Sequence, residues 1–208
     1  MTEEMPVVIE CPSCGERYLI WAAMSELPQG TTYYSDGYFT SDNKWRTPEI
    51  IGCVTCELGF TPQSGKIIAT PNREEFLQHW SHLKPAQPPT TGALVLELRA
   101  RKNMDTTMEK VLRKELWYST SHTTAGKNLL ENNAKFRNFW NDSMVQLEAL
   151  FDRNNPAELL LKAEANRQLG HYEQCLELLL GEQSNMAEAI RNAAQRENCT
   201  LLVVAGKK

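Results

Sequence analysis

The chain has 208 residues, a formal net charge of −4 and 41% hydrophobic residues. No apolar run approaches the ~20 residues of a membrane-spanning helix, so we expect no membrane partner. The acidic balance argues against a sequence-independent nucleic-acid binder, because such proteins draw their affinity from clustered lysine and arginine, although it still allows a local basic patch.

Two Cys-x-x-Cys pairs are the most informative motif in the N-terminal part of the chain. They are Cys11 with Cys14, and Cys53 with Cys56. Within each pair the two intervening residues turn the backbone so that both sulfurs point toward one centre, and two such pairs can supply the four thiolates of a tetrahedral structural zinc site. We therefore predict one Zn²⁺ held by these four cysteines.

The two pairs differ in the residue that follows them. Gly15 comes directly after the first pair and tolerates the positive φ that such a turn needs. Glu57 stands in that place after the second pair, which Gly52 and Gly59 flank. The stretch between the pairs is longer than the roughly 15–20 residues of the simplest zinc-ribbon spacing, so we expect an insertion there.

Three other interpretations of the paired cysteines stay open. Disulfides need an oxidising compartment, but residues 1–4 begin no charged-then-apolar signal segment, so we expect a cytoplasmic protein. A redox Cys-x-x-Cys sits at a helix N-terminus and needs no second pair. Mixed ligation would use His79 and His82, for which a helix surface is the simpler location. The two remaining cysteines, Cys175 and Cys199, we expect to be buried and reduced.

Five short runs of β-branched or aromatic residues predict the strands of a zinc ribbon around the cysteine pairs. The metal would replace the hydrophobic core that so small a sheet can hardly build. We expect the last two runs to form a closing hairpin. The runs are 7–10, 18–21, 49–52, 58–62 and 66–69.

Residues 31–40 predict a β-hairpin inserted between the cysteine pairs, because aromatic runs flank Asp36-Gly37, a favoured pair for a tight turn. The aromatic side chains of 33–39, together with Trp45, allow three roles. They can pack a small sheet, which is the commonest role, form a recognition surface for a protein, or stack on nucleotide bases.

A proline-rich segment predicts the domain boundary. Asn72 can cap a helix, and the segment that follows this helix, 84–92, carries prolines that forbid helix and favour an extended connector. We therefore expect three regions: a zinc ribbon with an inserted hairpin at 1–71, a helix and linker at 72–92, and a helical domain at 93–208.

Beyond the linker the pattern is mainly helical. Residues 93–101 predict a short helix or strand, and Asp105 can cap a helix that ends near 119–124. Apolar residues then recur at helical spacing from Leu129 to Phe151, which predicts one long helix with a core-facing stripe.

Two further helices joined at a glycine predict an antiparallel hairpin. Asn155 can cap the first of them, with Pro156 at its first position. Gly170 ends this helix and Gly181 ends the next, and we expect a side chain at position 170 to collide with the helix pair. The last two elements are a helix at about 186–197 and an apolar segment with β character at 201–204.

These helices carry a resemblance. Ala-Glu-Ala at 163–165 and Leu-Gly-His-Tyr-Glu at 169–173, with Cys175 at a small-residue position, resemble one degenerate tetratricopeptide (TPR) motif. Tyr-Ser-Asp-Gly-Tyr at 34–38, shortly before a Cys-x-x-Cys pair and with TPR-like helices downstream, is similar to a group of uncharacterised bacterial proteins that combine a zinc ribbon with a helical repeat domain. The resemblance implies this architecture and a cytoplasmic location, and it implies no activity.

The candidate phosphate-binding and catalytic motifs in the sequence are incomplete. Gly126-Lys127 and Gly65-Lys66 lack the other residues of a phosphate-binding loop, and the adjacent Ser121-His122 cannot form a triad. Zinc held by four thiolates keeps no position for water. We therefore expect an α+β protein that is not an enzyme and has no catalytic residue. Its TPR-like helices would bind a protein partner as an interaction or adaptor module, and the alternative is a nucleic-acid-associated factor that uses the ribbon.

Overall fold

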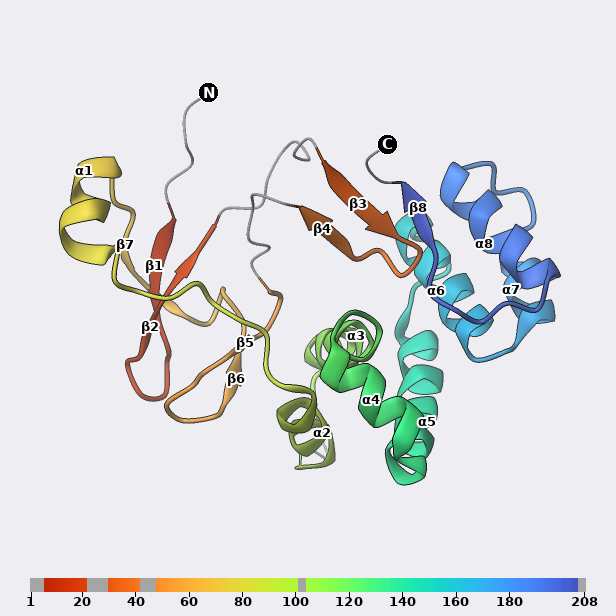
Figure 1. Ribbon diagram of the computed structural model, residues 1–208, viewed down its shortest axis with the longest axis horizontal. Helices are drawn as coiled ribbons and strands as arrows, with labels where there is room; N and C mark the ends of the chain where they lie inside the picture. The colour runs from red at the N-terminus through yellow and green to blue at the C-terminus, as the bar shows by residue number, and fades with distance from the viewer. Residues whose placement is uncertain (1–5, 22–29, 42–47, 101–103, 206–208) are drawn as a thin grey trace. The chain divides into compact units, whose positions relative to one another are not determined.

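The computed structural model describes residues 6–21, 30–41, 48–100 and 104–205 (Figure 1). Short antiparallel strands precede a series of helices, which confirms the α+β class. The chain divides into two compact units. The first contains Met1–Pro28 and Asn43–Lys102, and the second contains Gln29–Asp42 and Asn103–Lys208.

The first unit is built on a three-stranded antiparallel sheet in the order β2-β1-β7, beside a two-stranded sheet of β5 and β6. β1 is the central strand, so its residues Val8 and Ile9 are fully buried. The strands are β1 (Val7–Glu10), β2 (Arg17–Ile20), β5 (Ile51–Gly52), β6 (Gly59–Phe60) and β7 (Lys66–Ala69).

The closing hairpin expected over 58–62 and 66–69 is wrong. β6 pairs with β5, and β7 pairs with β1. In the turn between them, the carbonyl of Thr61 accepts hydrogen bonds from the amides of Ser64 and Gly65, and beyond this turn β7 joins the edge of β1. The strands that flank the two cysteine pairs therefore belong to two small sheets.

The proline-rich segment lies along the first unit instead of connecting two domains freely. The amide of Leu19 donates to the Lys84 carbonyl at 3.0 Å, and the amide of Ala86 donates to the Leu19 carbonyl at 2.8 Å. Prolines cannot donate, but their neighbours complete these bonds. α2 (Thr91–Ala100) follows as a helix with Leu94 fully buried. The first unit thus ends after α2, whereas the expected helical domain began at residue 93.

The helix expected from Asn72 is short. Asn72 caps α1 (Arg73–Glu75), as the sequence predicts, and its contacts with Glu75 complete a capping box. The chain then continues as one π-helical turn, η1 (Phe76–Trp80). Leu77 in this turn is 60% exposed, and neither α1 nor η1 contains a buried residue.

The inserted hairpin belongs to the helical unit and not to the ribbon. β3 (Thr31–Tyr34) and β4 (Phe39–Ser41) form an antiparallel sheet with β8 (Val203–Ala205) in the order β4-β3-β8. Figure 1 shows β8, drawn in blue, alongside β3. The apolar segment expected at 201–204 therefore supplies an edge strand to the hairpin.

Buried polar contacts explain why the hairpin joins the helices. The carboxylate of Asp36 is fully buried and lies 2.7 Å from Nε2 of His122, the last residue of α3 (Thr106–His122). The hydroxyl of Ser35 donates to Glu164 of α6 (Pro156–Gln168) at 2.7 Å, and Glu164 forms a fully buried ion pair with Arg167. Breaking such contacts leaves buried groups unpaired, so they hold the hairpin in this unit.

The aromatic side chains of the hairpin pack within this unit. The ring of Tyr38 stacks on His122 with centroids 4.0 Å apart, and the ring of Tyr34 meets His122 edge-on at 4.6 Å. This favours the packing interpretation of 33–39, because the stacked rings are not free to bind bases. Trp45 lies outside the described residues.

The single long helix expected from Leu129 to Phe151 is two helices. Asn133 lies in extended conformation between α4 (Thr124–Asn132) and α5 (Ala134–Leu150), and its side chain accepts a hydrogen bond from the Phe136 amide. A residue that caps the second helix in this way also ends the first. Apolar residues keep their helical spacing across Asn133, so the spacing alone does not indicate a break in the helix.

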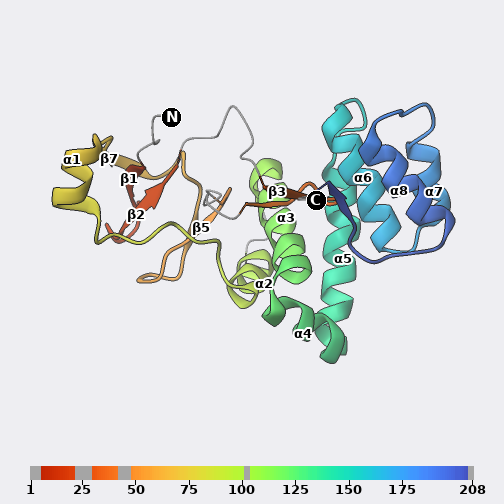
Figure 2. The same cartoon turned by 45° about the horizontal axis from the view of Figure 1, so that its top comes forward.

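The predicted helical hairpin is confirmed, with Asn155 as cap and Pro156 in the first turn of α6. α6, α7 (Tyr172–Leu178) and α8 (Asn185–Gln195) lie side by side in Figure 2. Gly170 has φ +81°, but a Cβ built on it meets nothing within 4 Å, so the expected collision is wrong. The shared core consists of Ala163, Cys175, Leu179, Ala187, Ile190 and Ala194.

Candidate metal centre

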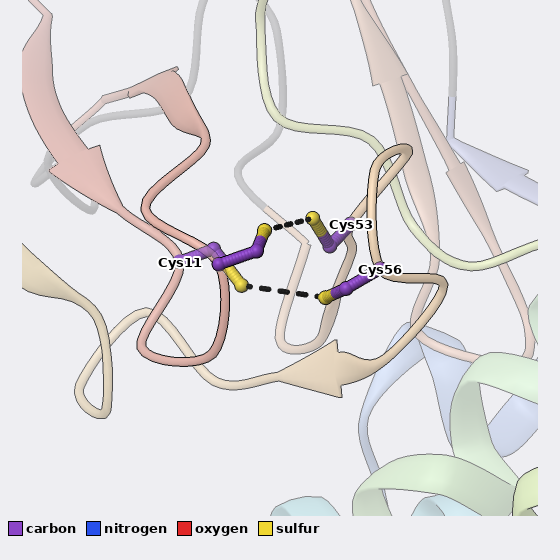
Figure 3. A group of neighbouring side chains, drawn as sticks. Cys11, Cys53 and Cys56 are labelled. Carbon is purple, nitrogen blue, oxygen red and sulfur yellow. Dashed lines mark hydrogen bonds between the residues drawn. The ribbon is translucent and has the colours of Figure 1, made fainter.

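The four paired cysteines come together in the first unit. Their sulfur atoms all lie within 4.8 Å of one another, with 3.8 Å between Cys11 and Cys56 and 3.4 Å between Cys14 and Cys53. Figure 3 shows sulfurs from the two chain segments pointing toward each other. A tetrahedron with metal–sulfur bonds of ~2.3 Å has edges of about 3.8 Å. The cluster therefore fits a metal ion with four thiolate ligands.

Each Cys-x-x-Cys pair sits in a turn, or knuckle, with the same hydrogen bonds. The amide of Gly15 donates to the Cys11 carbonyl at 3.0 Å, and the amide of Glu57 donates to the Cys53 carbonyl at 2.9 Å. A second bond joins the amide of the first cysteine to the carbonyl five residues later, at 2.7 Å in the first knuckle and 3.1 Å in the second. The two knuckles are thus structurally equivalent despite their different sequences.

The equivalence requires a left-handed residue after each pair. Gly15 has φ +79° and Glu57 has φ +60°. Glycine adopts this conformation without penalty, while a residue with a Cβ loses roughly 1 kcal/mol. The second knuckle therefore forms at a conformational cost at Glu57, where the first knuckle has a glycine.

Burial separates the ligands into two kinds. Cys11 and Cys53, the first cysteine of each knuckle, are each 3% exposed and belong to an apolar cluster. Cys14 is exposed and Cys56 is half-buried. The remaining buried members of the cluster are Ile9, Tyr18, Ile51, Phe60 and Ala86.

The thiols of the cluster differ in acidity. Burial raises the pKa of Cys53, but hydrogen bonds from Tyr18 and from the amides of Cys56 and Thr55 outweigh it and lower this pKa to about 6. The amide of Glu16 lowers the pKa of Cys14, but desolvation and the neighbouring thiols raise it to about 12. The hydrogen bonds of the second knuckle therefore favour the thiolate form of Cys53, which is the form that binds a metal ion.

Three side chains that the sequence pattern does not single out hold the knuckles together. The hydroxyl of Thr55 in the second knuckle donates to the carboxylate of Glu16 after the first, at 2.7 Å. The phenol of Tyr18 in β2 contacts both Val54 and Cys53 of the second knuckle. In the sequence, Tyr18 is recognisable only as a residue of the strand that leaves the first knuckle. This position does not indicate that its side chain contacts the second knuckle.

The other candidate residues lie apart from the thiol cluster. His79 and His82 are exposed, and the cluster found among the described residues consists of cysteines alone. All six cysteines are free thiols, Cys175 is buried as expected, and the expectation that Cys199 is buried is wrong because it is exposed.

Comparisons of the chain with models of protein families, with curated proteins and with solved structures found no match. In the part of the chain that the structure describes, every helix is too short or too polar to cross a membrane.

Proposed function

We propose that this chain is a non-catalytic zinc-binding protein whose helical unit acts as a protein-interaction or adaptor module, working in the reducing cytoplasm. The observation that carries the zinc assignment is the group of four thiols within 4.8 Å, presented by two equivalent knuckles. Four sulfur ligands suit zinc, and a tetrahedral site filled by protein sulfurs has no position for a substrate or an activated water. A bound zinc ion would cross-link the two knuckles.

The helical unit supports the adaptor role through its hairpin of α6 and α7. Gly170 occupies the left-handed position after α6, where its amide donates to the Arg167 carbonyl and the amide of His171 donates to the Asn166 carbonyl. This tight antiparallel connection, with α8 packed against both helices, is consistent with one TPR-like unit. Stacked helix pairs present extended faces that commonly bind partner peptides.

A cleft of about 720 Å³ in the helical unit offers a place for such a peptide. Trp140, Leu130 and Leu201 give it apolar walls, Lys127 and Arg137 bring positive charge, and Glu131 brings one negative charge. Arg137 already donates to the carbonyls at the end of α4. The ammonium group of Lys127 has no hydrogen-bond or ion-pair partner among the described residues, so it is available to a ligand. We infer that the partner presents an acidic side chain next to an apolar one.

Binding of short labelled peptides to the full chain tests this function. We expect peptides with glutamate beside leucine to bind more tightly than peptides with lysine in place of the glutamate, as measured by fluorescence anisotropy. Lys127→Glu should reverse this order by removing the positive charge. Lys135→Glu is the matched control, since Lys135 is exposed on α5 and does not line the cleft. Equal binding of both peptide classes to the unaltered chain and to Lys127→Glu contradicts the proposal.

The same assay separates the nucleic-acid alternative. Labelled single-stranded and double-stranded oligonucleotides replace the peptides, at low and at moderate salt. Phosphate binding weakens steeply as salt rises, because it releases condensed counterions. Salt-dependent binding of oligonucleotides, with no binding of either peptide class, replaces the adaptor function by a nucleic-acid function.

A further inference from the structure

Tyr18 makes two hydrogen bonds to the second knuckle through one buried oxygen atom. The residue is 4% exposed. The amide of Val54 donates to its phenol oxygen at 3.0 Å, and the phenol O–H donates to the sulfur of Cys53 at 3.3 Å. Since the oxygen accepts from the amide, its single hydrogen is left for the sulfur. Tyr18 therefore fixes the orientation of Cys53 relative to its own backbone.

A hydrogen bond to a metal-bound thiolate changes the chemistry of the sulfur. It draws negative charge away from the sulfur, which makes the thiolate less nucleophilic and its bond to the metal less prone to exchange. The bond lies in the apolar cluster around Cys11 and Cys53, where water does not compete with it.

Cys14 has the opposite surroundings. It is the exposed cysteine of the first knuckle, and among the described residues no side-chain hydroxyl donates to its sulfur. Its polar contacts are with the amide of Glu16 and with the neighbouring thiols. A reagent arriving from solvent therefore reaches the sulfur of Cys14 with less obstruction than that of Cys53.

We propose that Tyr18 is a positioning residue of the metal centre that protects Cys53, and that thiol-directed electrophiles enter the centre at Cys14. This inference rests on the proposed zinc site. With a maleimide, the sulfur of Cys14 forms a C–S bond to one alkene carbon and a proton from water adds to the other. The thioether is a poor ligand, so the zinc–sulfur bond breaks and Zn²⁺ leaves.

The test treats the zinc-loaded full chain with N-ethylmaleimide and follows zinc release with a coloured indicator. Peptide mass spectrometry records the order of labelling. We expect Cys14 to be labelled first and Cys53 last among the four ligands. In Tyr18→Phe, Cys53 should be labelled about 10-fold faster, the lower end of the effect of losing an outer-shell partner, while the labelling rate of Cys14 stays unchanged.

Tyr172→Phe is the matched control, because the phenol of Tyr172 donates to the Glu197 carbonyl in the helical unit. It should leave the zinc release rate and the order of labelling unchanged. The absorption spectrum of cobalt-loaded protein reports on the electrons of the metal-bound sulfurs. A change in packing without a change in hydrogen bonding to sulfur would not shift its charge-transfer band. Loss of the O–H···S bond makes the Cys53 thiolate richer in electrons, so the sulfur-to-cobalt charge-transfer band should shift to longer wavelength in Tyr18→Phe.

Three results overturn the inference. They are labelling of Cys53 as early as Cys14 in the unaltered chain, an unchanged labelling rate of Cys53 in Tyr18→Phe, and an unmoved charge-transfer band in that variant. If Tyr18→Phe fails to fold, the order of labelling in the unaltered chain decides. If the unaltered chain holds no zinc at all, the proposed metal centre fails first, and this outcome is distinguishable from the other three.

Discussion

Gly126→Ala tests how tightly α4 packs on α3. A Cβ at position 126 would lie 2.1 Å from the carbonyl oxygen of Ser119 and 2.7 Å from the Cα of Thr120. Both are backbone atoms, so no side chain can rotate away. The Ser119 carbonyl is also held by Thr123, whose hydroxyl donates to it at 2.6 Å. The corner between the two helices must therefore open to admit one methyl group.

The magnitude follows from two opposing terms. Overpacking typically destabilises by 1–3 kcal/mol, and a clash between backbones belongs at about 3 kcal/mol or above. Replacing glycine by alanine inside a helix increases the free energy of unfolding by up to about 1 kcal/mol. We expect a net loss of about 2 kcal/mol in the free energy of unfolding of the helical unit, which lowers its Tm by roughly 8 °C.

Chemical denaturation followed by circular dichroism measures this loss, and Gly170→Ala is the comparison within the same unit. Gly170 has φ +81° but open space around its Cβ, so its replacement should cost only the backbone strain of about 1 kcal/mol. The reasoning is refuted if Gly126→Ala destabilises the helical unit less than Gly170→Ala does.

Three further predictions concern both units. Glu57→Gly should stabilise the zinc-loaded first unit by about 0.5 kcal/mol, since relief of the left-handed strain exceeds the added entropy of the unfolded chain; an equal or lower melting temperature speaks against the equivalence of the knuckles. Asp36→Ala should cost the helical unit about 3 kcal/mol, because it leaves the His122 ring and the Tyr38 amide without their buried acceptor. The exposed pair of Glu10 and Arg17 is the control, and Glu10→Gln should cost less than 1 kcal/mol in urea denaturation of the first unit. Removal of metal by a chelator should abolish hydrogen-exchange protection in β1, β2 and α2 while α3–α8 keep theirs, and loss of protection in α3–α8 means that the units are not independent.

Local signals in the sequence predicted much of the fold because they act over a few residues. Asn72, Asp105, and Asn155 with Pro156 each begin a helix as expected, since a cap and the amides it satisfies lie within one turn. The spacing within each cysteine pair has the same local character, and it identified all four members of the thiol cluster.

Contacts between distant segments could not be predicted in this way. Ser35 and Glu164 are 129 positions apart, and nothing near either residue indicates the other, so the hairpin was assigned to the ribbon. Tyr18 and Cys53 are 35 positions apart, and their hydrogen bond was missed for the same reason. The proline-rich segment misled because prolines exclude helix but do not prevent neighbouring amides and carbonyls from pairing with the ribbon.

The zinc content of the purified chain tests the account most directly. Native mass spectrometry of protein expressed with zinc should show one Zn²⁺ per chain. Cys14→Ser should lose the metal and unfold the first unit, because structural zinc contributes about 10–16 kcal/mol in small zinc-dependent folds. Cys199→Ser, which changes an exposed thiol of the helical unit, should keep a full complement of zinc. A metal-free chain with a folded first unit, or a Cys14→Ser variant with full zinc, would contradict the four-cysteine zinc site.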